Sequence, residues 1–70
     1  MGSETLKDIA TLELPYRRVA MVREVTHESG LRLLRLVLRE GSRITQVDLD
    51  EESAVALGSM LVENAAAGES

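Results

Sequence analysis

The sequence predicts an α+β fold: a four-stranded antiparallel β-meander followed by one C-terminal α-helix packed on one sheet face (ββββα). Three observations lead to this prediction. Alternating apolar residues flank a tight turn at 41–42, two further alternating segments precede that hairpin, and a segment with helical periodicity follows it. With 70 residues the chain is long enough for one domain. We assign this domain to residues 6–66 and expect disordered termini at 1–5 and 67–70.

The best-defined segment is a β-hairpin over residues 31–49. Gly41-Ser42 is a two-residue loop with glycine first, which suits a type II′ turn and fixes the register of both strands. Because side chains alternate between the faces of a strand, one face collects aliphatic residues and the other mixes them with charges. The expected cross-strand partners are Leu34 with Leu49, Leu36 with Val47 and Leu38 with Thr45 on the first face, and Arg35 with Asp48, Val37 with Gln46 and Arg39 with Ile44 on the second.

Two more strands are expected before the hairpin. The first covers 9–14 and ends before Pro15, because proline lacks the backbone donor that a central strand needs. The second covers 17–27, and Arg23 interrupts its otherwise apolar face. A β-bulge near Met21–Arg23 would relieve this interruption.

The turn between the second and third strands leaves two registers open. A two-residue loop at Ser29-Gly30 is favoured, because Glu24, Arg35 and Asp48 then form a row of alternating charge across three strands. A four-residue loop is the alternative and shifts the pairing by two residues. The favoured register also pairs Val22 with Val37 and Val25 with Leu34.

A helix is expected after the last strand. Asp50 is a suitable N-cap, and Glu51 and Glu52 follow in the first turn, where the helix dipole favours negative charge. A narrow stripe of small residues around two leucines recurs at helical spacing, so it is expected to cover the leucine face of the hairpin and form the core there. Gly58 on this stripe predicts a close approach of helix to sheet. The helix is expected to end in the run 65–68.

The sheet face that the helix leaves uncovered is the predicted functional surface. The chain has no cysteine and one aromatic residue, Tyr16, so its core is small and aliphatic. Small domains without disulfides often gain stability by association, and a half-apolar face suits that role, although single apolar residues are also common on monomer surfaces. We therefore predict a non-enzymatic, homodimeric interaction module. The residues expected at this interface, or at a polyanion-binding surface in its place, are Val22, Arg35, Val37, Arg39, Ile44, Arg17, Arg18 and Arg43.

Charge is segregated along the chain and suggests an alternative function. The net charge is −4, yet residues 17–43 carry seven arginines and three acids (+4), whereas the remainder carries Lys7 and nine acids (−8). An arginine-rich sheet is a candidate surface for single-stranded nucleic acid. Such proteins usually add stacking aromatic residues, and overall negative charge opposes binding to a polyanion. Nucleic acid is therefore the alternative partner, and a second copy of the chain is the favoured one.

Motifs for catalysis, metal binding or membrane insertion are not evident. His27-Glu28-Ser29 has the residue types of a hydrolytic triad, but neighbours in a tight turn cannot reach the geometry that this chemistry needs. Asp48, Asp50 and Glu52 alternate like the start of a calcium loop, but Ser53 stands where that loop needs glycine. We expect no cofactor, metal or small-molecule ligand. With no apolar run of ~20 residues and no signal peptide, we also expect a cytoplasmic protein.

Several short motifs lie between Arg23 and Asp50. They are Glu28-Ser29-Gly30-Leu31, Arg35-Leu36, Arg39-Glu40-Gly41, Arg43 and Asp48-Leu49-Asp50. This stretch resembles a family of short proteobacterial proteins of unknown function, which implies a similar small β-rich fold and a bacterial source, and no particular activity. In its order of elements the chain is also similar, by analogy only, to the transcriptional coactivator PC4-like domains, whose four strands and helix dimerise and bind single-stranded DNA.

Overall fold

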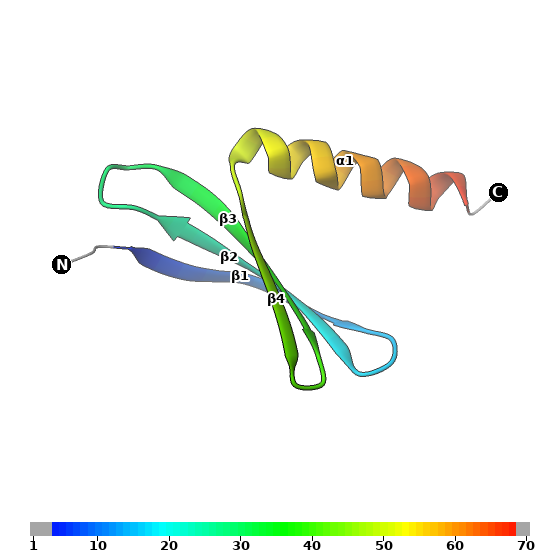
Figure 1. Ribbon diagram of the computed structural model, residues 1–70. Helices are drawn as coiled ribbons and strands as arrows, with labels where there is room; N and C mark the ends of the chain where they lie inside the picture. Colours follow the sequence, from blue (N-terminus) through cyan, green and yellow to red (C-terminus); the bar gives the residue numbers. More distant parts are fainter. Residues whose placement is uncertain (1–3, 69–70) are drawn as a thin grey trace.

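One antiparallel sheet and one helix make up the computed structural model, which describes residues 4–68 (Figure 1). The predicted β-meander with a C-terminal helix is confirmed. The first strand begins earlier than the expected residue 9, and parts of the termini that we predicted to be disordered, 1–3 and 69–70, lie outside the described residues. The strands are β1 (Thr5–Leu14), β2 (Arg18–Thr26), β3 (Arg32–Glu40) and β4 (Arg43–Leu49), and the helix α1 (Glu51–Ala67) follows them. Each strand is hydrogen-bonded to the next one along the chain.

The β3–β4 hairpin has the register that its turn predicts. A type II′ turn requires a positive φ at its first central residue and not at its second. Gly41 has a φ of +59°, and the φ of Ser42 is not positive. Arg35 lies opposite Asp48, and the other pairs follow as predicted. The prediction for this hairpin is therefore confirmed both in register and in the residues that each face carries.

The β2–β3 turn differs from both registers that the sequence left open. The amide of His27 donates to the carbonyl of Leu31 at 2.8 Å, and the amide of Gly30 donates to the carbonyl of His27 at 2.8 Å. Gly30 has a φ of +94°. This geometry is a three-residue loop, in which a type I turn is followed by glycine in a left-handed conformation. The two-residue and four-residue loops were therefore both wrong.

The extra loop residue moves every residue of β2 by one position relative to β3. Val22 lies opposite Leu36 and not, as predicted, opposite Val37. Glu24 lies opposite Leu34, so the predicted charge row that included Glu24 is wrong. Because a shift of one residue exchanges the two faces of a strand, Val22 joins the face that α1 contacts.

The sheet has two unlike faces, which we name by their position relative to α1. The helix-side face is mostly aliphatic, and its aliphatic members are Ala10, Leu12, Leu14, Ala20, Val22, Leu34, Leu36, Leu38, Val47 and Leu49. The far face interleaves apolar and charged residues, and it includes Leu6, Asp8, Val19, Met21, Arg23, Val25, Leu33, Arg35, Val37, Arg39, Ile44 and Asp48.

A β-bulge lies in β1 and not, as predicted, in β2. The pairing shifts between Asp8, which lies opposite Arg23, and Ala10. Ile9 is therefore the extra, unpaired residue of the bulge. Arg23 itself stays in regular pairing, because Asp8 lies opposite it on the far face with Oδ1 3.0 Å from the arginine Nε. The charge that we expected to disturb β2 is thus neutralised by the neighbouring strand.

The buried core is small and lies on the far face. Val25 is 0% exposed and Val37 is 4% exposed, and they are the only buried apolar residues in the described part of the chain. The expectation that the leucine face forms the core beneath the helix is wrong: Leu34 and Leu36 are half-buried and Leu38 is exposed. The physical reason is that α1 contacts only β3 and β4 and runs outward beyond the sheet (Figure 1).

Helix α1 begins and ends where the sequence predicts. The Asp50 carboxylate accepts a hydrogen bond from the Ser53 amide at 2.7 Å, and hydrogen bonds from Ser53 lower the pKa of Asp50. Gly68 forms the C-cap. The predicted close approach at Gly58 is wrong, because a Cβ placed there would meet nothing within 4 Å. Every residue from 59 to 66 is exposed, so the second half of the helix buries little surface against the described chain.

Candidate interaction surface

A row of four charged residues crosses the far face, one from each strand, in the order Asp8, Arg23, Arg35 and Asp48. The two arginines are direct cross-strand neighbours, an arrangement that is unfavourable for like charges. Each arginine is matched by the acid on the adjacent outer strand. Arg23 contacts Asp8 at 3.0 Å, and Arg35 donates from Nε and Nη2 to both carboxylate oxygens of Asp48 at 2.7 and 3.1 Å. The row therefore holds two ion pairs, one that joins β1 to β2 and one that joins β3 to β4.

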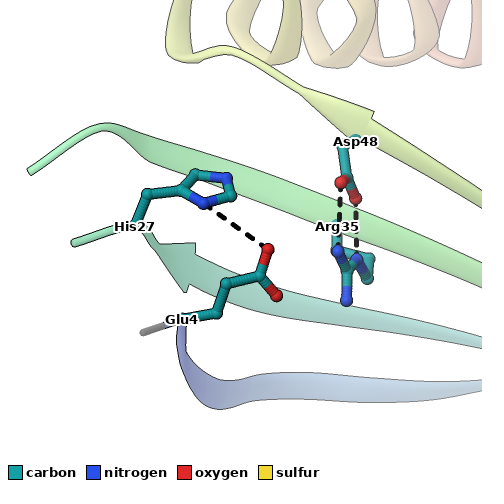
Figure 2. A network of polar contacts seen from close by, with 4 residues as sticks. All are labelled: Glu4, His27, Arg35 and Asp48. Atoms are coloured by element: carbon teal, nitrogen blue, oxygen red, sulfur yellow. Dashed lines mark hydrogen bonds and ion pairs between the residues drawn. The ribbon is translucent and has the colours of Figure 1, made fainter. Parts of the chain in front are cut away.

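The Arg35–Asp48 pair is the better-shielded half of this row. Figure 2 shows the guanidinium and the carboxylate meeting through two roughly parallel contacts. The Arg35 side chain is only 16% exposed. The hydrogen bond from Arg35 lowers the pKa of Asp48, and the same hydrogen bond raises the pKa of Arg35.

A second polar contact lies beside that pair at the β2–β3 end of the sheet. His27 Nδ1 lies 3.4 Å from Glu4 Oε2, and the Glu4 side chain points from the start of β1 toward the histidine (Figure 2). Sequence reasoning missed Glu4, because we assigned residues 1–5 to a disordered terminus. Leu6, an apolar residue that lies opposite Val25 on the far face, was the available signal that β1 extends this far.

The predicted interface residues are divided between the two faces. On the far face, Val37 is already covered by its own chain, whereas Ile44 is exposed. Assigning Val22 to this face was wrong, because the β2–β3 register is shifted by one residue. The far face holds Arg35, Val37, Arg39 and Ile44, the helix-side face holds Arg18, Val22 and Arg43, and the β1–β2 turn holds Arg17.

Arg32 joins the start of α1 to the sheet. Its Nε contacts Glu24 Oε2 at 2.6 Å, and its Nη1 contacts Glu51 Oε2 at 2.7 Å. The hydrogen bond to Glu24 is the main reason that the pKa of Arg32 is raised. Because Glu51 is the first residue of α1, this contact fixes the helix only at its N-terminal end.

Four arginines gather where the β1–β2 and β3–β4 turns lie (Figure 1). Arg18 Nη1 lies 3.9 Å from Glu40 Oε2, a long ion pair between exposed groups. Within residues 4–68 no ion pair joins Arg17, Arg39 or Arg43 to an acid. We call Arg17, Arg18, Arg39 and Arg43 the arginine end of the sheet. Of these four arginines, only Arg18 has an ion pair among the described residues.

The helix-side face leaves several apolar side chains open to solvent. Leu12, Leu38 and Val47 are exposed on the sheet, and within residues 4–68 the helix packs against β3 and β4 and reaches β2 only at the groove beside Val22. On α1, Val55 and Val62 are each 69% exposed and Leu61 is 64% exposed. Sequence reasoning missed this surface, because it expected the helix to cover the whole leucine face.

An open groove of about 160 Å³ runs between α1 and the sheet on this side. Its walls are aliphatic and include Val22, Leu36 and Leu49 from the strands and Leu57 and Leu61 from the helix. Among the described residues, no ionisable side chain lines it. A groove of this composition favours contact with another apolar surface.

Among residues 4–68 no three or more histidine, cysteine, aspartate or glutamate side chains are placed to hold a metal ion. In the same range no helix has the length and apolar character needed to span a bilayer. What the described residues do offer is two surfaces, one apolar and one charged.

Comparison with known proteins identifies the family. The chain matches a family model described as a family of unknown function (DUF6967) over residues 3–67, nearly its whole length. This protein belongs to the DUF6967 family. No curated protein and no solved structure matches the chain. The resemblance to a family of unknown function is thus confirmed, and the function of this DUF6967 member must be argued from its surfaces.

Proposed function

We propose that this DUF6967 protein is a non-enzymatic interaction module that forms a homodimer. The observation that carries the proposal is the large surface that the chain exposes. Its accessible area is 5646 Å² for a mass of 7.7 kDa, whereas a compact protein of this mass exposes about 4,300 Å². The surplus of about 1,300 Å² exceeds the roughly 800 Å² that each partner contributes to an interface of standard size.

The shape of the chain supports the same proposal. Its radius of gyration is 14.1 Å and it measures 50 × 29 × 16 Å, whereas a compact chain of this length has a radius of gyration of about 11 Å. The difference comes from α1, which extends away from the sheet (Figure 1). Since helices in proteins gain most of their stability from tertiary packing, an unpacked apolar half-helix favours a partner.

The test is the mass of the protein in solution across a range of concentrations. Sedimentation equilibrium or light scattering coupled to gel filtration should give twice 7.7 kDa at high micromolar concentration and a reversible decrease on dilution. A mass of one chain at every concentration would exclude the homodimer. Masses that keep growing with concentration would indicate open-ended association and would also contradict the proposal.

Binding of single-stranded nucleic acid is a second candidate, supported by the arginine end. Tyr16 at the tip of the adjacent turn is exposed, and the Arg18 guanidinium lies 5.5 Å from the centre of its ring. Against this candidate, Arg23, Arg32 and Arg35 are occupied by acids of the same chain, and the net charge is −4. Stacking on a single aromatic residue supplies little affinity compared with the several that such proteins use.

An oligonucleotide titration separates the two candidates. Fluorescence anisotropy with a labelled single strand should show no binding at low salt if the module is purely self-associating. Binding that weakens steeply with salt, and that is lost when Arg17, Arg39 and Arg43 are changed to glutamine, would establish the second candidate. These three substitutions leave the ion pairs between β1 and β2 and between β3 and β4 intact.

A further inference from the structure

We infer that the open part of the helix-side face is covered by α1 of a second copy, so that two copies exchange their helices reciprocally. This inference rests on the proposed homodimer and assigns its interface. It places that interface on the opposite side of the sheet from the residues Arg35, Val37, Arg39 and Ile44 that the sequence suggested. The occupant is the C-terminal half of the partner's helix.

The sheet contributes a continuous apolar floor. Leu12 lies opposite Ala20, and Ala20 lies opposite Leu38, so one row of aliphatic side chains crosses β1, β2 and β3. A parallel row crosses all four strands and consists of Ala10, Val22, Leu36 and Val47. The chain's own helix contacts only β3 and β4. The floor over β1 and β2 is therefore open to a helix from outside.

The helix contributes an apolar stripe that its own sheet does not use. Val55 and Val62 are seven residues apart, so they lie on the same side of α1. Leu61 lies on the neighbouring side of the helix, at the edge of the groove between α1 and its own sheet. All three side chains are more than three-fifths exposed. One chain thus offers both an unused apolar helix stripe and an unused apolar sheet face.

Charge complementarity favours the same pairing. Within residues 51–67 the helix carries Glu51, Glu52 and Glu63 and no lysine or arginine. The helix-side face ends at Arg18 and Arg43 of the arginine end, on either side of Glu40. A partner helix whose C-terminal half lies across β1 and β2 toward that end would bring its Glu63 near these arginines. The chain's own helix cannot do so, because Arg32 fixes its start at the other end of the sheet.

The reciprocal arrangement also explains why a second copy, and not another partner, is the occupant. In a two-fold dimer the same surface is buried on both copies. The apolar stripe of each helix therefore packs against the open sheet face of the other copy. The surplus accessible area of about 1,300 Å² per chain is the size that such an exchange needs. In this arrangement the apolar stripe of each helix and the open part of each helix-side face are both covered.

Two variants on different elements test the inference against a matched control. Val62→Glu adds charge to the helix stripe, and Leu12→Lys adds charge to the sheet floor; both positions are exposed within one chain, so the fold of the single chain should tolerate them. Ile44→Glu is the control, because Ile44 is 62% exposed on the far face. Each of the first two should raise the dimer dissociation constant at least tenfold, and the control should leave it unchanged. Circular dichroism verifies that all three remain folded.

Mixing Val62→Glu with Leu12→Lys is the decisive measurement. In a mixed dimer both substitutions fall in one of the two half-sites, where the introduced carboxylate on the helix would face the introduced ammonium group on the sheet, and the other half-site is native. The mixture should therefore form a heterodimer more tightly than either variant forms its own dimer. If Ile44→Glu breaks the dimer and Val62→Glu does not, or if mixing restores nothing, the helix exchange is wrong although the homodimer stands. A wild-type protein that is monomeric would instead overturn the proposed function.

Discussion

Arg35 is held by two hydrogen bonds to Asp48 while little of its side chain remains in water. A bidentate pair of this kind is stronger and more directional than a single contact between exposed charges. It also offsets the repulsion between Arg35 and its direct neighbour Arg23. Removing the carboxylate would leave the two adjacent arginines with one ion pair among residues 4–68, between Arg23 and Asp8.

We predict that Asp48→Asn lowers the free energy of unfolding at neutral pH and makes this free energy less dependent on pH in the acidic range. Because Arg35 lowers the pKa of Asp48 in the folded state, the pair stabilises the protein above the unfolded aspartate pKa of about 3.9. This stabilisation is lost as the pH falls through the folded pKa. Urea unfolding midpoints of wild type and Asp48→Asn should therefore differ most at pH 7 and converge below about pH 4.

The matched control for this experiment is Asp8→Asn. Asp8 meets Arg23 through one ion-pair contact, and the Asp8 side chain is 83% exposed. At pH 7, Asp8→Asn should therefore lower the free energy of unfolding by less than Asp48→Asn does. A difference between wild type and Asp48→Asn that stays constant from pH 7 to pH 3 would contradict the role assigned to the ion pair.

At the scale of the elements, the two hairpins show when a sequence determines the register of neighbouring strands. Gly41-Ser42 leaves one compatible turn, so the β3–β4 register and the positions of Arg35 and Ile44 were predictable. The segment around Gly30 is compatible with loops of two, three or four residues, because glycine allows positive φ in several turn types. The structure adopts three, and this single residue moved Val22 to the other face.

We predict that Gly30→Ala lowers the free energy of unfolding by about 1–2 kcal/mol, because a residue with a Cβ is strained at a positive φ. No atom lies within 4 Å of the added Cβ, so the effect reports the backbone alone. Gly68→Ala is the control, since Gly68 has a φ of −74° and its Cβ would meet only ordinary contacts at 3.6 and 3.7 Å. Denaturant unfolding of both variants measures the difference; equal stability would show that the turn tolerates alanine.

The helix shows a different limit of prediction. Its cap at Asp50 and its end at Gly68 follow from local hydrogen bonding, so the sequence pattern located both. How much of the sheet it covers depends on the angle at which it leaves β4, which no periodicity encodes. The candidate interface was therefore predicted on the face that holds Val25 and Val37, while the open surface lies beneath and beside the helix.

At the scale of the whole molecule, stability and association are expected to be coupled. A chain with two buried apolar residues in its described part has little core of its own, so contacts between copies should supply much of its stability. The sequence could suggest association from the absence of disulfides and the single aromatic residue in a short chain. It could not supply the accessible area or the shape on which the proposal depends.

We predict that the thermal midpoint of unfolding rises with protein concentration. For a folded dimer that unfolds to two separate chains, a hundredfold increase in concentration should raise the midpoint by roughly 5–10 °C. Calorimetry or circular dichroism melts from low to high micromolar concentration measure this shift. Val62→Glu should reduce the concentration dependence, whereas Ile44→Glu should preserve it. A wild-type midpoint that does not change with concentration would contradict the coupling.

The bulge at Ile9 has a consequence for how far assembly can proceed. β1 is an outer strand of ten residues, and an unpaired strand edge of that length is a template on which strands of other molecules can polymerise. The extra residue interrupts the regular repeat of amide and carbonyl groups along β1, and the charges of Lys7 and Asp8 lie just before it. Fibre growth through the β1 edge is thereby opposed, which is compatible with a finite assembly that forms through the broad faces of the sheet.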